Sequence, residues 1–148
     1  FQGGEKPRFD LLEAVPSNLF LVFGDEPLAT SSAVSRYLAW AHEHPADCWR
    51  HRRISDVIVR RVLRTGRWSD ALRAGRRVTK WLGDKIGVPV EPVELCNRLD
   101  RIELEGHAGK PAGAGGELAV CLAASECAVP DWSWVRPISS STTGVGVR

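Results

Sequence analysis

Hydrophobic positions in the first half of the chain form one short apolar run and then a stretch with helical spacing. The run Leu19–Phe23 ends at a Gly-Asp-Glu-Pro sequence, which predicts a buried strand followed by a turn. Hydroxyl side chains at residues 30–32 can cap a helix that reaches about His44, where Pro45 stops it. We therefore expect a strand followed by a helix over residues 30–44.

Two further amphipathic helices are predicted over residues 48–64 and 69–82. At about 100° per residue, apolar side chains fall on one side of the first of them and arginines on the other. The short turn between the two helices contains Gly66. In the second helix Ala71, Val78 and Trp81 share a face, and Gly83 lies just past its expected end.

The second half of the chain has the pattern of a sheet. Ile102 and Leu104 alternate with glutamates, so residues 93–105 are predicted to be extended, and residues 107–116 form a loop rich in Gly, Ala and Pro. Residues 118–123 and 132–135 are predicted strands. The predicted fold is α+β, with a helical N-terminal half of about three helices packed against a small, mainly antiparallel sheet from the C-terminal half.

Length and composition predict one globular domain. The chain has 148 residues, of which 43% are hydrophobic and 26% charged. We assign the domain to residues 5–138, residues 1–4 to the remnant of a purification tag, and residues 139–148 to a flexible tail. No apolar run is long enough to span a bilayer, and four cysteines without a CxxC pair indicate reduced thiols. These features predict a cytoplasmic protein without a membrane partner.

Positive charge is concentrated in one segment. Residues 48–85 carry a net charge of +9 and the remainder −7. Because nucleic-acid backbones require many cations on one surface, we predict a domain that binds DNA or RNA through the phosphates with a basic, helix-turn-helix-like pair. Trp68 in the turn is placed to stack on a base. The predicted phosphate contacts are Arg50, Arg53, Arg60, Arg64, Arg67, Arg73, Arg76, Arg77 and Lys80.

The same arginines also fit two other interpretations. Arginine-rich faces are common solvated surfaces whose charges pair with acidic residues of the same domain. Alternatively, the basic helices form a protein-interaction module that docks an acidic partner protein.

A thiol and a histidine suggest an enzymatic alternative. Asp47-Cys48-Trp49 opens a predicted helix, and His107 opens the half of the chain predicted to be sheet. This order resembles papain-like cysteine proteases, including the compact leader proteases of RNA viruses. The resemblance implies that Cys48 is the nucleophile and His107 the general base, and it would make this a viral protein.

Metal and nucleotide chemistry have less support in the sequence. His42, His44, Cys48 and His51 are four zinc-type donors within ten residues, but their spacing matches no standard finger or ribbon. The glycines at 113–116 lack the Lys and Ser/Thr that follow in a phosphate-binding loop. We therefore expect no metal and no cofactor.

Overall fold

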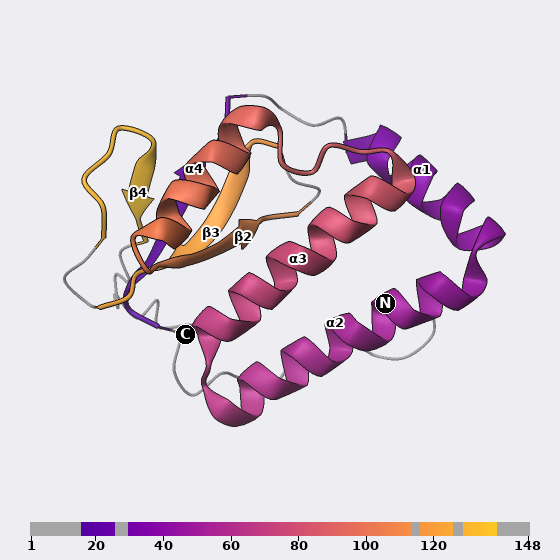
Figure 1. Ribbon diagram of the computed structural model, residues 1–148, viewed down its shortest axis with the longest axis horizontal. Coiled ribbons are helices and arrows are strands. Elements are labelled where there is room, and N and C mark those ends of the chain that lie inside the picture. Colours follow the sequence, from indigo (N-terminus) through magenta and orange to yellow (C-terminus); the bar gives the residue numbers. More distant parts are fainter. Residues whose placement is uncertain (1–15, 26–29, 114–115, 126–128, 139–148) are drawn as a thin grey trace, which may run out of the picture.

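One strand, four helices and then three strands follow one another along the described part of the chain (Figure 1). The computed structural model describes residues 16–25, 30–113, 116–125 and 129–138. The predicted tag remnant and tail lie outside these ranges. The elements are β1 (Leu19–Phe23), α1 (Thr30–Glu43), α2 (Pro45–Thr65), α3 (Trp68–Ile86), α4 (Val93–Leu104), β2 (Ala108–Pro111), β3 (Leu118–Leu122) and β4 (Val135–Pro137).

The four strands form one antiparallel sheet in the order β2-β3-β1-β4. β1 pairs with β3 along its whole length, so that Phe20 lies opposite Cys121, and with β4 on its other side. The strand from the N-terminal half thus lies inside the sheet formed by the C-terminal half. Four helices and a small antiparallel sheet confirm the predicted α+β class.

The core lies between α4 and one face of the sheet. Alternate residues of β1 and β3 point to this face because side chains alternate along a strand. Phe20, Val22 and Cys121 are fully buried there. α4 contributes Leu95, Leu99 and Ile102, which also have no exposed surface. Each large aliphatic or aromatic side chain buried in this way stabilises the fold by about 1.5–3 kcal/mol.

The extended structure predicted for residues 93–105 is wrong, because this segment is the helix α4. Leu95, Leu99 and Ile102 are spaced as one helix face, and burial of that face against the sheet decides the structure. The alternation of Ile102 and Leu104 with glutamates does not mark a buried strand face, since Ile102 is fully buried and Leu104 is 88% exposed.

α2 and α3 form a long antiparallel hairpin on one side of the molecule (Figure 1). α2 has a proline at its N-terminus and ends at Gly66, whose φ of 64° is the left-handed conformation that favours glycine. α3 contacts β2 and β3, whereas α2 contacts only α1 and α3 among the described elements. α2 is therefore the outermost long helix, separated from the sheet by α3.

Three other predicted boundaries need correction. α3 continues to Ile86 and ends at Gly87, while Gly83 is a buried helical residue against Val88 and Val90. The segment predicted as a loop over residues 107–116 contains β2, which pairs with β3. The last strand begins at Val135, three residues later than predicted.

Candidate functional site

A pocket of about 480 Å³ lies between α2, α3 and the end of β2. Its wall is mainly aliphatic because the facing sides of the two helices carry valine, leucine and isoleucine. The residues that form most of this wall are Ile58, Val59, Val62, Leu72, Val78 and Leu82. Its volume falls in the range of small-molecule sites.

Lys110 of β2 is the cation that lines this pocket. Its ammonium group donates a hydrogen bond to the carbonyl of Pro111 at 2.7 Å, and it has no carboxylate partner in the described residues. Burial lowers the pKa of Lys110 below its ordinary value. The pocket thus contains a partly desolvated positive charge that an anion can neutralise.

Two glycines, Gly75 and Gly113, lie beside Lys110 or line the same pocket. A Cβ atom at Gly75 of α3 would lie 3.0 Å from Cδ of Lys110, so the missing side chain leaves room for the lysine stem to cross the helix. Gly113, which also lines the pocket, has a φ of 57° and open space where a side chain would lie. Backbone groups there are open to close approach by a ligand.

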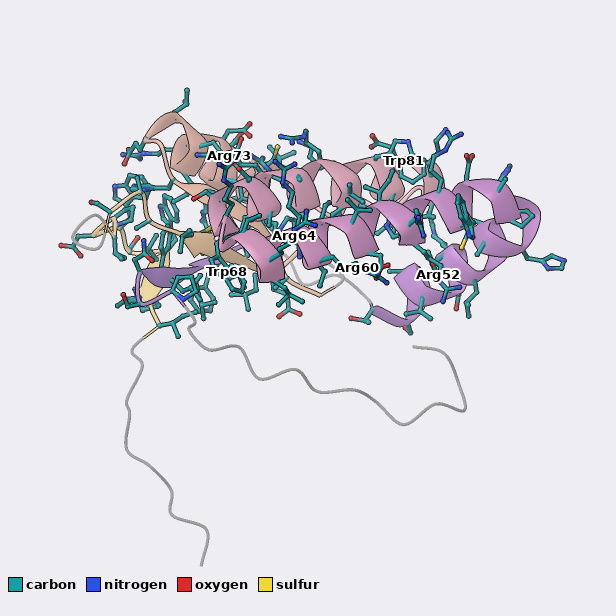
Figure 2. All side chains as sticks on the ribbon, turned by 90° about the horizontal axis from the view of Figure 1, so that it is seen from below. Arg52, Arg60, Arg64, Trp68, Arg73 and Trp81 are labelled. Atoms are coloured by element: carbon teal, nitrogen blue, oxygen red, sulfur yellow. The ribbon has the colours of Figure 1, made fainter. Side chains whose placement is uncertain are left out.

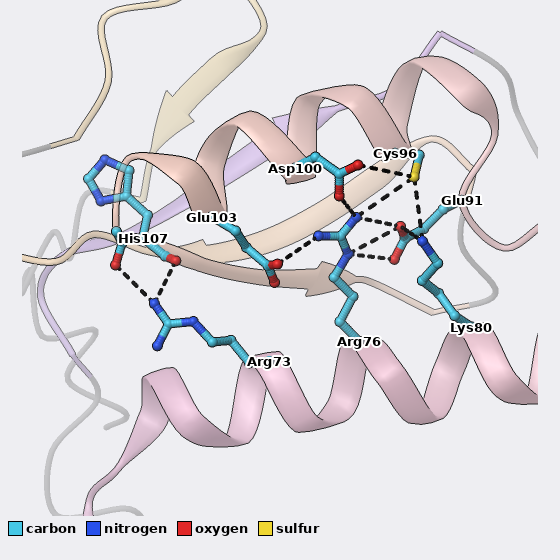
Figure 3. Close-up of polar contacts among 9 residues, drawn as sticks. Arg73, Arg76, Lys80, Glu91, Cys96, Asp100, Glu103 and His107 are labelled. Carbon is cyan, nitrogen blue, oxygen red and sulfur yellow. Dashed lines mark hydrogen bonds and ion pairs between the residues drawn. The ribbon is translucent and has the colours of Figure 1, made fainter.

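Arg76, one of the predicted phosphate contacts, is buried in a carboxylate cluster between α3 and α4 (Figure 3). Its guanidinium group donates three hydrogen bonds to Glu91 at 2.8, 2.9 and 3.1 Å and another to Asp100 at 2.6 Å. Oε2 of Glu103 lies 3.2 Å from Nη1 of Arg76. Burial alone lowers the pKa of Arg76, but the hydrogen bonds and charges of these carboxylates raise it above its ordinary value. Arg76 therefore joins two helices and is not accessible to a phosphate.

Arg73 and Lys80 also make intramolecular contacts (Figure 3). Arg73 donates hydrogen bonds to the carbonyls of Gly106 and His107 at 3.0 and 2.9 Å. The ammonium group of Lys80 lies 3.4 Å from Glu91 and 3.5 Å from the Cys96 sulfur. These side chains link α3 to the segment that follows α4 and to the carboxylate cluster.

The other predicted phosphate contacts remain on the surface. Figure 2 shows Arg60 and Arg64 along α2, with Trp68 beyond its end at the start of α3. Arg60 pairs with Asp56 at 2.9 Å and Arg50 lies 3.9 Å from Asp47, in both cases as exposed ion pairs within α2. We call the exposed set the α2 basic surface, which includes Arg67 from the turn after α2 and Arg77 from the neighbouring helix α3. Its members are Arg50, Arg53, Arg60, Arg64, Arg67 and Arg77.

The structure does not bring Cys48 and His107 together. Cys48 lies in the first turn of α2, and its sulfur lies 3.5 Å from the hydroxyl of Tyr37. His107 is buried beside Phe20, accepts a hydrogen bond from the amide of Ala124 at Nδ1, and adjoins Arg73 near the other end of the hairpin. At 1.5 Å per residue, the length of α2 separates these ends by about 25 Å. No nucleophile–base pair forms from these two residues.

The four zinc-type donors of the weaker alternative, His42, His44, Cys48 and His51, do not assemble either. Across the described ranges, which include all four residues, no group of three or more His, Cys, Asp or Glu side chains is placed to hold a metal ion. His44 packs against Trp40, and His51 stacks on Trp81 with a ring-centroid distance of 6.1 Å. These histidines pack among aromatic side chains, and burial lowers the pKa of His51.

Lys110 was missed in the sequence because the pattern that we sought places the lysine after the glycines. Here the lysine precedes Gly113, and it reaches the pocket from a strand. The signal available was a lysine inside a segment otherwise made of small residues and proline, from Ala108 to Gly113.

No protein-family model matches the chain, and no curated protein matches it. Two solved structures share its fold. The Lin0012 protein from Listeria innocua matches 77% of this chain with a TM-score of 0.70 and 22% identity. The mevalonate kinase of L. major, solved with R-mevalonate, matches 72% with a TM-score of 0.59 and 24% identity. The chain spans about one third of the length of both proteins, 34% and 33%.

The helices of this fold are amphipathic or short. In the described ranges none is both long and apolar enough to span a membrane.

Proposed function

We propose that this chain is one domain of a small-molecule kinase of the mevalonate kinase type, and that the Lys110 pocket contributes to its substrate site. The observation that supports this proposal is the position of Lys110, a half-buried cation that lines the pocket and has no carboxylate partner in the described residues. The fold around it is shared with a mevalonate kinase. Because the chain spans 33% of the length of that protein, the proposal is for one domain and not for a whole kinase.

Phosphoryl-transfer sites need fixed cations and backbone N–H groups around the phosphate oxygens, because the protein contributes mainly positioning and charge stabilisation. Lys110 supplies the cation. The open backbone at Gly113 lies beside the same pocket. The glycine pattern of the sequence offers little support for nucleotide binding, so the proposal depends on Lys110 and its pocket instead.

Binding is the appropriate test for a domain of this size. Calorimetric titration of the chain with ADP, R-mevalonate and inorganic phosphate should detect binding of at least one of them, and Lys110→Gln should weaken it about tenfold or more. Lys85→Gln provides a matched control, because Lys85 lies on the last turn of α3 and does not line the pocket. No binding to any of the three, or equal effects of both variants, would refute the proposal.

Nucleic-acid binding by the α2 basic surface is the second candidate. It is favoured by the exposure of four of these arginines on α2, which contacts only α1 and α3 among the described elements: Arg50, Arg53, Arg60 and Arg64. The hairpin is antiparallel, so α3 does not cross α2 as the recognition helix of a helix-turn-helix unit does. We therefore propose contacts with phosphates along α2, in DNA or RNA.

The two candidates depend on different residues. If α2 binds nucleic acid, fluorescence anisotropy should show affinity that falls steeply with salt, and Arg53→Gln with Arg64→Gln should lower the salt slope by about one for each lost contact. Lys110→Gln should have no effect on that binding. The docking-module alternative predicts a different result. In that case an acidic partner protein would bind the α2 basic surface and oligonucleotides would not.

A further inference from the structure

We infer that the pocket between α2 and α3 takes an amphipathic anion, a small molecule with an apolar body and one acidic end group that pairs with Lys110. The inference goes beyond the proposed function, because the apolar wall and the cation of the pocket carry it whether or not the chain belongs to a kinase.

The chemistry of the wall limits the body of the ligand. Most side chains around the pocket are aliphatic, and the uncharged polar groups beside them are the hydroxyls of Ser55 and Thr79 and the ring of His51, whose buried Nδ1 has no hydrogen-bond partner in the described residues. Thr79 already donates its hydroxyl hydrogen to the carbonyl of Gly75 at 2.9 Å. Ser55 and His51 can accept or donate few hydrogen bonds, so a ligand rich in hydroxyl groups would lose more hydrogen bonds to water than it regains here, and each such loss is costly. An apolar body avoids that cost.

Lys110 limits the end group. Its stem crosses α3 at Gly75, and its ammonium group has only the Pro111 carbonyl as a hydrogen-bond acceptor among the described residues. A single positive charge beside an apolar wall favours one anionic group at that end of the ligand. The arginines of α2 add a positive field that raises the local concentration of anions. Carboxylates and phosphate monoesters share this chemistry.

Titrations with a homologous series test both parts of the inference. The probes are butanoate, hexanoate, octanoate and hexyl phosphate, measured by calorimetry on the chain. Affinity should rise about two- to fourfold for each added methylene, because each one buries apolar surface. Hexyl phosphate compared with hexanoate distinguishes the two kinds of end group.

Variants at the rim of the pocket locate the binding. Val59→Asp places a carboxylate at the pocket and should weaken octanoate binding at least tenfold, as should Lys110→Gln. Val57→Asp is the matched control, because Val57 lies outside this pocket and is 54% exposed, compared with 53% for Val59. It should change affinity less than twofold, and the melting temperatures of both aspartate variants should stay close to that of the wild type.

The outcomes separate this inference from the proposed function. Affinity for ADP or R-mevalonate that depends on Lys110, with no effect of alkyl length, overturns the inference and leaves the proposed function standing. Binding of octanoate that Val59→Asp and Lys110→Gln abolish, without binding of ADP, R-mevalonate or phosphate, supports the pocket and refutes the kinase proposal. Equal effects of Val57→Asp and Val59→Asp overturn the assignment of the pocket.

Discussion

Arg76 and Lys110 show two different environments for a partly or fully buried cation in one small fold. Arg76 contacts three carboxylates, and every edge of its planar guanidinium group has an acidic partner. Lys110 has a carbonyl acceptor and an apolar pocket. The charge of Arg76 is therefore neutralised by carboxylates within the fold, whereas the charge of Lys110 is open to neutralisation by an anionic ligand.

Replacement of Lys110 by methionine should stabilise the free protein. The folded state binds the Lys110 proton more weakly than the unfolded state, because burial lowers the pKa. The cost of keeping this lysine charged is thus fully present at neutral pH and disappears as pH rises toward the ordinary lysine value of about 10.4. Thermal melts should show Lys110→Met a few degrees above wild type at pH 7 and the difference shrinking by pH 10. A lower melting temperature for Lys110→Met at pH 7 would contradict the assigned environment.

Replacement of Arg76 by alanine should have the opposite effect. Glu91, whose side chain is 2% exposed, would lose its bidentate partner and keep only Lys80 at 3.4 Å. Breaking one side of a buried ion pair typically costs about 3–5 kcal/mol, and the remaining lysine places the expected loss near the lower end of that range. Urea unfolding measures this loss. Arg77→Ala, an exposed neighbour on the same helix, should change stability by less than about 0.5 kcal/mol.

At the scale of elements, the sequence predicted the helices with one-sided apolar patterns and the strands with continuous apolar runs. β1, α2 and β3 were found close to their predicted bounds because their local patterns agree with their packing. α4 was missed because its acidic residues made a short alternation look like a strand. The spacing of Leu95, Leu99 and Ile102 is that of a helix face. Only their burial against the sheet shows that this pattern, and not the short alternation, determines the structure.

Two glycines in α3 should respond differently to alanine. A Cβ at Gly83 would lie 2.7 Å from the carbonyl oxygen of Val88, which is backbone and cannot move without displacing the turn after α3. Gly83→Ala should therefore destabilise the protein by about 1–3 kcal/mol, despite the better helix propensity of alanine. At Gly75 the neighbour is the flexible Lys110 stem, so Gly75→Ala should cost less in chemical denaturation. Equal losses would mean that close packing at Gly83 is unimportant.

At the scale of the whole molecule, the charge asymmetry predicted from the sequence combines two different features. Arg76 and Lys80 serve the interface between α3 and α4, while the α2 basic surface remains exposed. Sequence periodicity could not separate them, because Arg76 and Arg77 are neighbours on one helix and only tertiary contacts show that the first is buried. The pocket could not be predicted from the sequence either, since its wall and its lysine come from two helices and a strand that only the fold brings together.

The arrangement of the elements also predicts uneven stability. α4, β1 and β3 share the fully buried core, whereas Val62 is the buried residue that α2 contributes among the described residues. Segments with few buried apolar contacts open with less free energy than the core. Hydrogen exchange measured by mass spectrometry should therefore show residues 45–65 exchanging at least tenfold faster than residues 93–104. An amphipathic anion bound between α2 and α3 should slow exchange in α2 and leave α4 unchanged. Uniform protection of both helices in the free protein would show that the hairpin and the core unfold as one unit.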